Sequence, residues 1–202
     1  TPGFKEALAN TEAFPIRGQG FASRVDALHV DAGFNRTAGA QHITGKPLDL
    51  SLQTGTWLAV QATDGSEAYT RGAALSVTPN GQLVTSSGRP VLDDNNNPIA
   101  IPPYQAMEVG NDGTISIIPQ GEGPQTMAMI GRIKIVQAAD ERLERRLDGL
   151  FANTDPQQPF AQAQGPTVHS GQLEGSNVDA AGALVQMIQL QRQYEMQVKV
   201  IK

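Results

Sequence analysis

The sequence lacks several of the residue types and patterns on which common functions depend. Cysteine is absent from its 202 residues, so disulfides, thiolate catalysis and cysteine-ligated zinc are excluded. Three histidines, His29, His42 and His169, are too few for a histidine-rich metal site. No apolar run approaches the ~18 residues of a membrane span, so membrane insertion is not expected. Lysine and arginine number 15 against 20 aspartates and glutamates, a net charge of −5, and no basic stripe for nucleic acid is present.

Length and composition are those of a folded chain with many turns. The 202 residues include 21 glycines and 13 prolines, well below the share typical of disordered low-complexity chains. A chain of this length buries enough surface to form a hydrophobic core. It begins at Thr1 without the charged and apolar segments of a secretory signal, so we interpret it as a piece of a longer protein.

The predicted fold class is mainly β: an antiparallel β domain with an irregular N-terminal arm and a long C-terminal α-helix. Over residues 43–137, short segments of alternating apolar and polar residues are separated by turn residues, which is typical of sheets with one buried face. Hairpins are predicted over residues 73–84, with a Pro-Asn-Gly turn, and over residues 107–117. Residues 1–42 show no sustained period and are expected to form the irregular arm.

The segment after the β domain is predicted to return toward the last helix without regular strands. Residues 138–176 are interpreted as a charged segment followed by a loop. Leu143 and Leu147 are spaced for a short helix in the charged part, and the glutamine-, proline- and glycine-rich residues 153–171 indicate a surface loop.

Residues 177–202 are predicted to form a long helix with coiled-coil spacing, capped by Ser176 or Asn177. About 25 residues would give a rod of roughly 37 Å. Its key positions recur at alternating spacings of four and three residues, which is typical of a coiled-coil seam. The helix therefore either docks on another chain or folds back on the β domain as a core helix. This assembly seam comprises Ala180, Leu184, Met187, Gln191, Tyr194, Val198 and Ile201, and Ile188 widens it.

No group of residues predicts catalysis, a metal site or a cofactor. Gly39–Lys46 is similar to a phosphate loop, but its glycines are one residue too far apart and Pro47 replaces the hydroxyl residue that holds magnesium. The loop Asp93–Asn97 offers oxygen ligands, but Pro98 and Tyr104 stand where a calcium loop needs glycine and glutamate. We therefore expect a protein that is not an enzyme and binds no cofactor.

Motifs at both ends of the chain resemble those of bacterial flagellar rod and hook proteins. Thr1–Lys5 resembles the turn after their N-terminal helix, and Leu173–Val178 resembles the segment that opens their C-terminal helix. The stretches 45–52 and 69–84 resemble parts of their β domains, and Tyr194–Ile201 is most similar to the proximal rod proteins. The family's N-terminal helix is missing, so the chain looks like a trimmed core. The motif residues are Thr1, Pro2, Gly3, Phe4, Glu174, Gly175, Ser176, Asn177 and Val178.

The resemblance implies a structural subunit of the flagellar basal-body rod, the drive shaft that crosses the periplasm and transmits torque. It implies export by the flagellar type III apparatus and assembly with other rod subunits, including the distal rod protein, through an inner layer of terminal helices. The isolated chain is expected to be a monomer. The alternative is a ligand- or glycan-binding extracellular β module in which Trp57, Tyr69 and Tyr104 line a groove.

Overall fold

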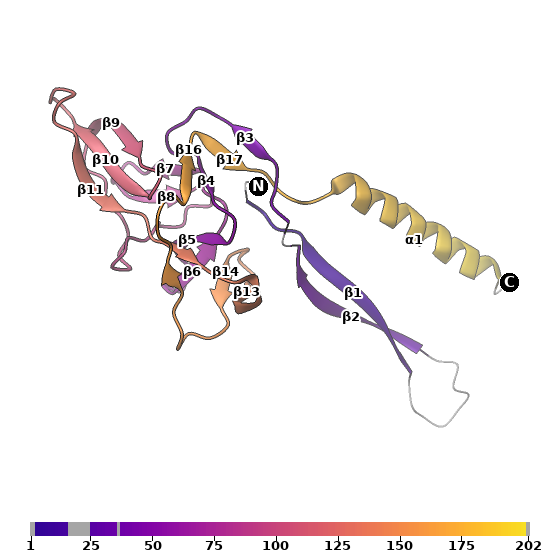
Figure 1. Cartoon of the computed structure of the whole chain (residues 1–202). Coiled ribbons are helices and arrows are strands. Elements are labelled where there is room, and N and C mark those ends of the chain that lie inside the picture. Colours follow the sequence, from indigo (N-terminus) through magenta and orange to yellow (C-terminus); the bar gives the residue numbers. More distant parts are fainter. Residues whose placement is uncertain (1–2, 16–24, 36, 201–202) are drawn as a thin grey trace.

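A computed structural model describes residues 3–35 and 37–200 apart from the segment 16–24, and its architecture is mainly β (Figure 1). Every strand pairing in this part of the chain is antiparallel. The predicted antiparallel β class is therefore confirmed. The strands between residues 41 and 174 form one body, which we call the β module, and a two-stranded ribbon and a helix extend from it (Figure 1).

The largest sheet of the β module has six strands in the order β13-β14-β6-β5-β12-β15. Its central strand β5 is apolar and almost entirely buried because it has a neighbour on both edges and side chains packed on both faces. The strands are β5 (Thr56–Gln61), β6 (Glu67–Thr70), β12 (Ile135–Gln137), β13 (Leu143–Arg145), β14 (Phe151–Asn153) and β15 (Ala161–Gln162).

A three-stranded sheet and three two-stranded pairings complete the β module. The expected hairpins are confirmed as the pair β9–β10 and the pair β7–β8, and their turns place Gly113 and Gly81 at positive φ. The three-stranded sheet contains β9 (Tyr104–Val109), β10 (Thr114–Pro119) and β11 (Ala128–Arg132). The pairs are β3 (Gln41–Ile43) with β17 (Gln172–Glu174), β4 (Leu50–Leu52) with β16 (Val168–Ser170), and β7 (Leu75–Val77) with β8 (Leu83–Thr85).

The prediction that residues 138–176 lack regular strands was wrong, because β13–β17 all lie there: β14–β17 pair with strands earlier in the chain, and β13 pairs with β14. The expected short helix is a 3₁₀ turn over Asp140–Arg142, and β13 follows it directly. Leu143 is buried and Leu147 is exposed, so the two do not share a face. Pairing with β14 sets the conformation here, and it outweighs the weak helical spacing of two leucines.

The prediction of an irregular N-terminal arm was also wrong for the described residues. Strands β1 (Ala7–Pro15) and β2 (Val25–Phe34) form an antiparallel ribbon that extends from the β module (Figure 1). A ribbon that leaves the core has no sheet face to cover, so the sequence alternation that marks a buried strand is not required. At its base, Phe34 packs against Trp57 and Phe151.

Two apolar clusters form the core of the β module. The larger one surrounds Leu58, Val60, Ile115 and Ile133, and the smaller one contains the buried aromatic residues Phe34, Trp57, Tyr69, Phe151 and Phe160. In the aromatic cluster, the ring centroids of Trp57 and Phe151 lie 4.8 Å apart.

The single α-helix of the described chain, α1, runs over Ala180–Val200 and projects from the β module (Figure 1). Its 21 residues correspond to about 31 Å, so it is shorter than predicted. The predicted cap was wrong: the Asp179 Oδ1 atom, rather than Ser176 or Asn177, accepts the Gly182 N–H at 3.0 Å. In the part of the chain that the structure describes, no helix has the length and apolar content needed to cross a bilayer.

Candidate functional site: a buried junction and an exposed helix

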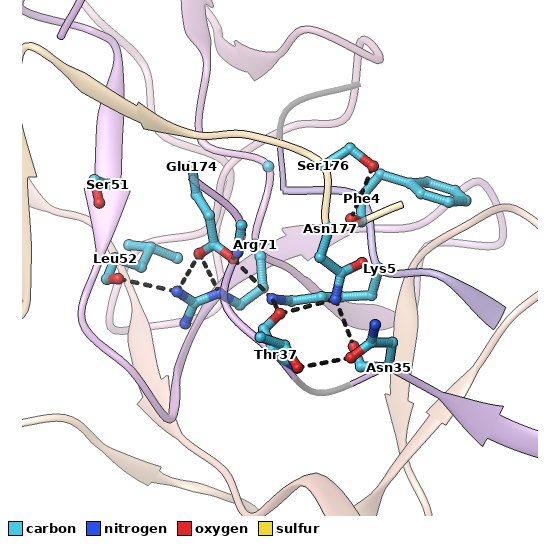
Figure 2. A network of polar contacts seen from close by, with 12 residues as sticks. Phe4, Lys5, Asn35, Thr37, Ser51, Leu52, Arg71, Glu174, Ser176 and Asn177 are labelled. Atoms are coloured by element: carbon cyan, nitrogen blue, oxygen red, sulfur yellow. Dashed lines mark hydrogen bonds and ion pairs between the residues drawn. The ribbon is translucent and has the colours of Figure 1, made fainter. Parts of the chain in front are cut away.

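A buried carboxylate joins the two ends of the chain to the β module (Figure 2). Glu174 is the last residue of β17 and is only 1% exposed. Its Oε1 atom accepts hydrogen bonds from Lys5 Nζ at 2.7 Å and from the Gly39 amide at 3.1 Å. Its Oε2 atom accepts from Arg71 Nε at 2.9 Å and forms an ion pair with Arg71 Nη2. The Glu174 carboxylate, which lies shortly before the C-terminal helix, thus binds Lys5 from the N-terminal segment and Arg71 from the end of β6.

Backbone carbonyls also hold the two cations of this site. Arg71 follows β6, and its guanidinium also donates to the backbone carbonyls of Leu52, Gln53 and Thr56. Lys5 Nζ donates in addition to the Thr37 carbonyl at 2.7 Å. These carbonyls satisfy the donors that one carboxylate cannot, as burial of two cations with one anion requires.

The electrostatics of the site keep Glu174 ionised. Burial by itself raises the pKa of this carboxyl, but the Lys5 hydrogen bond and the charge and hydrogen bonds of Arg71 outweigh it, so the pKa lies below its usual value. At neutral pH the group is therefore a carboxylate between two cations. Removing it would leave both cations buried without their anion, which is strongly unfavourable.

A second set of contacts lies next to Glu174, at Asn177. The Asn177 Oδ1 atom accepts the Glu6 amide at 2.8 Å, and its Nδ2 atom donates to the carbonyls of Asn35 and Thr37, both at 2.8 Å. Its backbone amide donates to the Phe4 carbonyl at 3.2 Å. One asparagine therefore fixes the N-terminal strand, the base of the ribbon and the start of the segment that leads into α1. We call Lys5, Arg71, Glu174 and Asn177 the terminal junction.

Close backbone approach makes glycine necessary at the edge of the junction. Gly3 donates its amide to the Glu174 carbonyl at 2.7 Å and has a φ of 66°. A Cβ at Gly3 would lie 2.3 Å from the Arg71 carbonyl carbon, and one at Gly39 would lie 2.0 Å from the Gly175 oxygen. Both distances are shorter than any real contact, so a larger residue would move the chain ends apart.

The structure brings together the motif residues that the sequence resemblance singled out at the two ends. Gly3 and Phe4 contact Glu174, Ser176 and Asn177 through backbone or side-chain hydrogen bonds. The Gly175 amide donates to the Ala40 carbonyl, and Val178 is the next residue after Asn177. Thr1 and Pro2 lie outside the described residues.

The sequence reasoning missed the central role of Arg71 and the contribution of Asn35 and Thr37. Arg71 stands in a stretch that resembled the family, and Lys5 stands in the N-terminal motif. Their place in family-like stretches was the only sign in the sequence that these two residues matter, because a sequence does not distinguish a buried charge from a solvated one.

Helix α1 exposes its apolar side chains. Of the predicted assembly seam, Leu184, Met187, Ile188 and Tyr194 are exposed, with values of 58% for Leu184 and 69% for Tyr194, and Gln191 is exposed as well. The side chains of Ala180 and Val198, and all of Ile201, lie outside the described residues. The described seam residues are therefore not packed on the β module, as the alternative of a core helix required. Apolar residues beside the seam are also exposed, namely Val185, Leu190 and Met196.

The remaining candidate sites of the sequence do not come together. Trp57 and Tyr69 are buried in the aromatic core, so the groove that they were to form with Tyr104 does not exist. The Asp93 carboxylate accepts the amides of Asn95 and Asn97 and so closes its own turn. Among the described residues, no three histidine, aspartate or glutamate side chains are grouped to hold a metal ion.

An exposed apolar helix beside a closed β module, with both chain ends fixed at one junction, defines a subunit of a larger assembly. Comparison with known proteins gives the family. Residues 169–202 match the family model described as flagellar basal body rod FlgEFG protein C-terminal, and residues 52–117 match the flagellar hook protein FlgE/F/G D1 domain.

Curated relatives extend this match to the whole chain. The chain is 42% identical to the flagellar basal-body rod protein FlgF of Escherichia coli K12 and 40% identical to FlgF of Salmonella typhimurium, in both cases over 100% of the chain and 81% of the relative. It is 34% identical to FlgG of Buchnera aphidicola subsp. Schizaphis graminum over 78% of the chain and 61% of that relative. The chain belongs to the family of flagellar basal-body rod proteins. It is a structural rod subunit, not an enzyme.

Proposed function

We propose that the chain assembles into the proximal part of the rod, with α1 in an inner helical layer and the β module in an outer layer. The observation that carries this proposal is the exposure of Leu184, Met187 and Tyr194 on a helix that leaves the β module. Exposed apolar side chains at this density are a cost in water that docking on neighbouring helices removes. The four-and-three spacing of the seam suits helix-on-helix packing.

The terminal junction supports the same proposal. Because Glu174 and Asn177 are tied to Lys5, Arg71 and Glu6, the segment leading into α1 leaves the β module at a fixed point. Force applied to the helix layer would pass to the β module through the buried hydrogen bonds of Glu174 with Lys5 and Arg71, and not through a flexible linker. This is the property that a torque-transmitting subunit requires.

The partners follow from the family resemblance, as proposals of the same kind. They are other rod subunits, including the distal rod protein, and the flagellar type III apparatus that exports the chain. The place of action is the part of the basal body that spans the periplasm.

The test uses the full-length protein in a motile bacterium that lacks its own copy. Leu184→Asp combined with Val198→Asp introduces two charges into the seam, and a form lacking residues 178–202 removes it. We expect both strains to be non-motile and to lack completed rods in purified basal bodies. Gln189→Asp, which adds a charge to an exposed residue of the same helix outside the seam, is the matched control and should swim. Normal swimming by the seam variants would contradict the proposal.

A further inference from the structure

The segment just before α1 crosses the β module and contacts parts of the chain that are far apart in the sequence. It contains β16 and β17, which lie beside β4 and β3 (Figure 1). It begins at the turn between β9 and β10, where the Thr167 and Val168 amides donate to the Asn111 carbonyl at 2.8 and 2.9 Å. It ends in the terminal junction. We call residues 167–177 the closing strap.

The closing strap supplies a core side chain and the partners of two other strands. Val168 is completely buried and belongs to the larger apolar cluster, together with Leu58. Among the described strands, β4 pairs only with β16, and β3 pairs only with β17. All three residues of β4 are buried. Detaching the strap would therefore leave a hole in the core and a buried strand without its partner, and both changes cost free energy.

A detached strap would also leave two buried cations without their anion. Glu174 lies in the strap, whereas its partners Lys5 and Arg71 lie in earlier parts of the chain and are each only 5% exposed. A buried charge that has lost its partner is strongly destabilising. The core, the strand pairing and the charge balance of the β module thus depend on the same short segment.

We propose that the closing strap completes the β module, so that the module is stably folded only with the strap in place. Helix α1 begins at Ala180, three residues after the strap ends at Asn177. Folding of the module and placement of the base of α1 are therefore a single event. This device belongs to the isolated chain and does not depend on assembly into a rod.

The order in which the chain becomes available gives the device a consequence. The Asn111 carbonyl and the Asp49 carbonyl, which accepts the Gly171 amide at 2.8 Å, both lie earlier in the chain than the strap. Contacts between distant segments form only after the entropy cost of closing the loop between them has been met. A chain made from its N-terminus therefore keeps its β module open until the strap has been made.

Native-state hydrogen exchange tests whether the strap opens by itself. The Val168 amide reports on the strap, and the Ile99 amide, which donates to the Val91 carbonyl at 3.0 Å, reports on the core. Both should exchange only when the whole module unfolds, so their protection factors should agree within about tenfold. A Val168 amide that exchanges more than about tenfold faster than the Ile99 amide would overturn the proposal.

Leu58→Ala weakens the core outside the strap and shows whether the two amides open together. Exchange of the Val168 and Ile99 amides should accelerate by the same factor, at least about 30-fold, because each then opens by unfolding of the module. Amides of residues 185–196 in α1 are the internal control and should not change, because the unpacked helix opens independently. Unchanged exchange at Val168 with faster exchange at Ile99 would overturn the proposal and leave the proposed rod function in place.

A matched pair of substitutions in the whole chain gives a second measurement. Val168→Asp places a charge in the core that is relieved only if the strap leaves it, and Trp57, the single tryptophan, reports on the other apolar cluster. We expect the Trp57 emission of Val168→Asp to shift to that of the urea-unfolded chain. Val185→Asp makes the same change at an exposed residue of α1 and should keep the native emission. Native Trp57 emission in Val168→Asp would overturn the proposal, because the module would then be stable without its strap.

Discussion

The β module and helix α1 use the same kinds of apolar residue in opposite ways. In the β module, Leu58 and Ile133 are completely buried by strands of their own chain. In α1, Leu184 and Tyr194 are more than half exposed. The difference shows that the β module has a core of its own, whereas the apolar surface of α1 has no cover among the described residues. Stability resides in the first region, and we propose that assembly uses the second.

The terminal junction lies between these two regions and differs from both. Its three charged residues are as buried as the core, and Glu174 lies between Lys5 and Arg71. Replacing such charges by apolar residues can stabilise a protein, so burial alone does not explain them. Directional hydrogen bonds fix the positions of the two chain ends, which apolar packing does less strictly.

The largest expected effect comes from breaking the junction. Glu174→Ala leaves Lys5 and Arg71 buried without their anion, which costs about 3–5 kcal/mol in the free energy of unfolding. Glu174→Gln keeps the shape and part of the hydrogen bonding and should cost less. Urea unfolding measures both variants. A change below about 1 kcal/mol for Glu174→Ala would show that the junction is not the tie described here.

The next effect contrasts the two regions directly with one chemical change. Leu58→Ala in β5 creates a cavity in the core and should lower the free energy of unfolding of the isolated chain by about 2–5 kcal/mol. Leu184→Ala in α1 should change it by no more than about 0.5 kcal/mol, because that side chain is exposed. Equal losses from the two substitutions would mean that α1 is part of the core.

A smaller effect is the pH dependence of the junction. Because the folded pKa of Glu174 lies below the ordinary carboxyl value of 4.5, its contribution is fully present above that value and is lost as the pH falls through the folded pKa. The stability advantage of the unsubstituted chain over Glu174→Gln should therefore be constant near neutral pH and shrink below about pH 4.5. Urea midpoints between pH 3 and 7 (roughly the range over which carboxyls titrate) measure it. An advantage that grows on acidification would contradict the ion-pair assignment.

Patterns of short range predicted the parts of the fold that depend on them. The hairpin turns at Gly81 and Gly113 require positive φ, so their sequences revealed them. Helix α1 lies where the spacing of the seam predicted a helix, although it begins at Ala180, three residues later than expected.

Parts of the fold that depend on distant partners could not be read in this way. Strand β16 pairs with β4, more than 100 residues earlier in the chain, and Val168 is buried by that pairing in a segment rich in turn residues. The junction is the extreme case, since Lys5 and Glu174 lie 169 residues apart. The end motifs marked both places by resemblance, but only the fold shows that they meet and that Arg71 joins them.

Hydrogen exchange tests the central claim, that α1 is completed by other subunits, most directly. In the isolated chain, at a concentration where sedimentation shows it to be monomeric, amides of residues 73–84 and 130–136 should exchange slowly. Those of residues 185–200 should exchange fast, because an unpacked helix is only marginally stable. In assembled rods of the full-length protein, residues 185–200 should become as protected as the β module. Slow exchange of residues 185–200 in the monomer would show that the helix already has its partner within the chain, and would contradict this account.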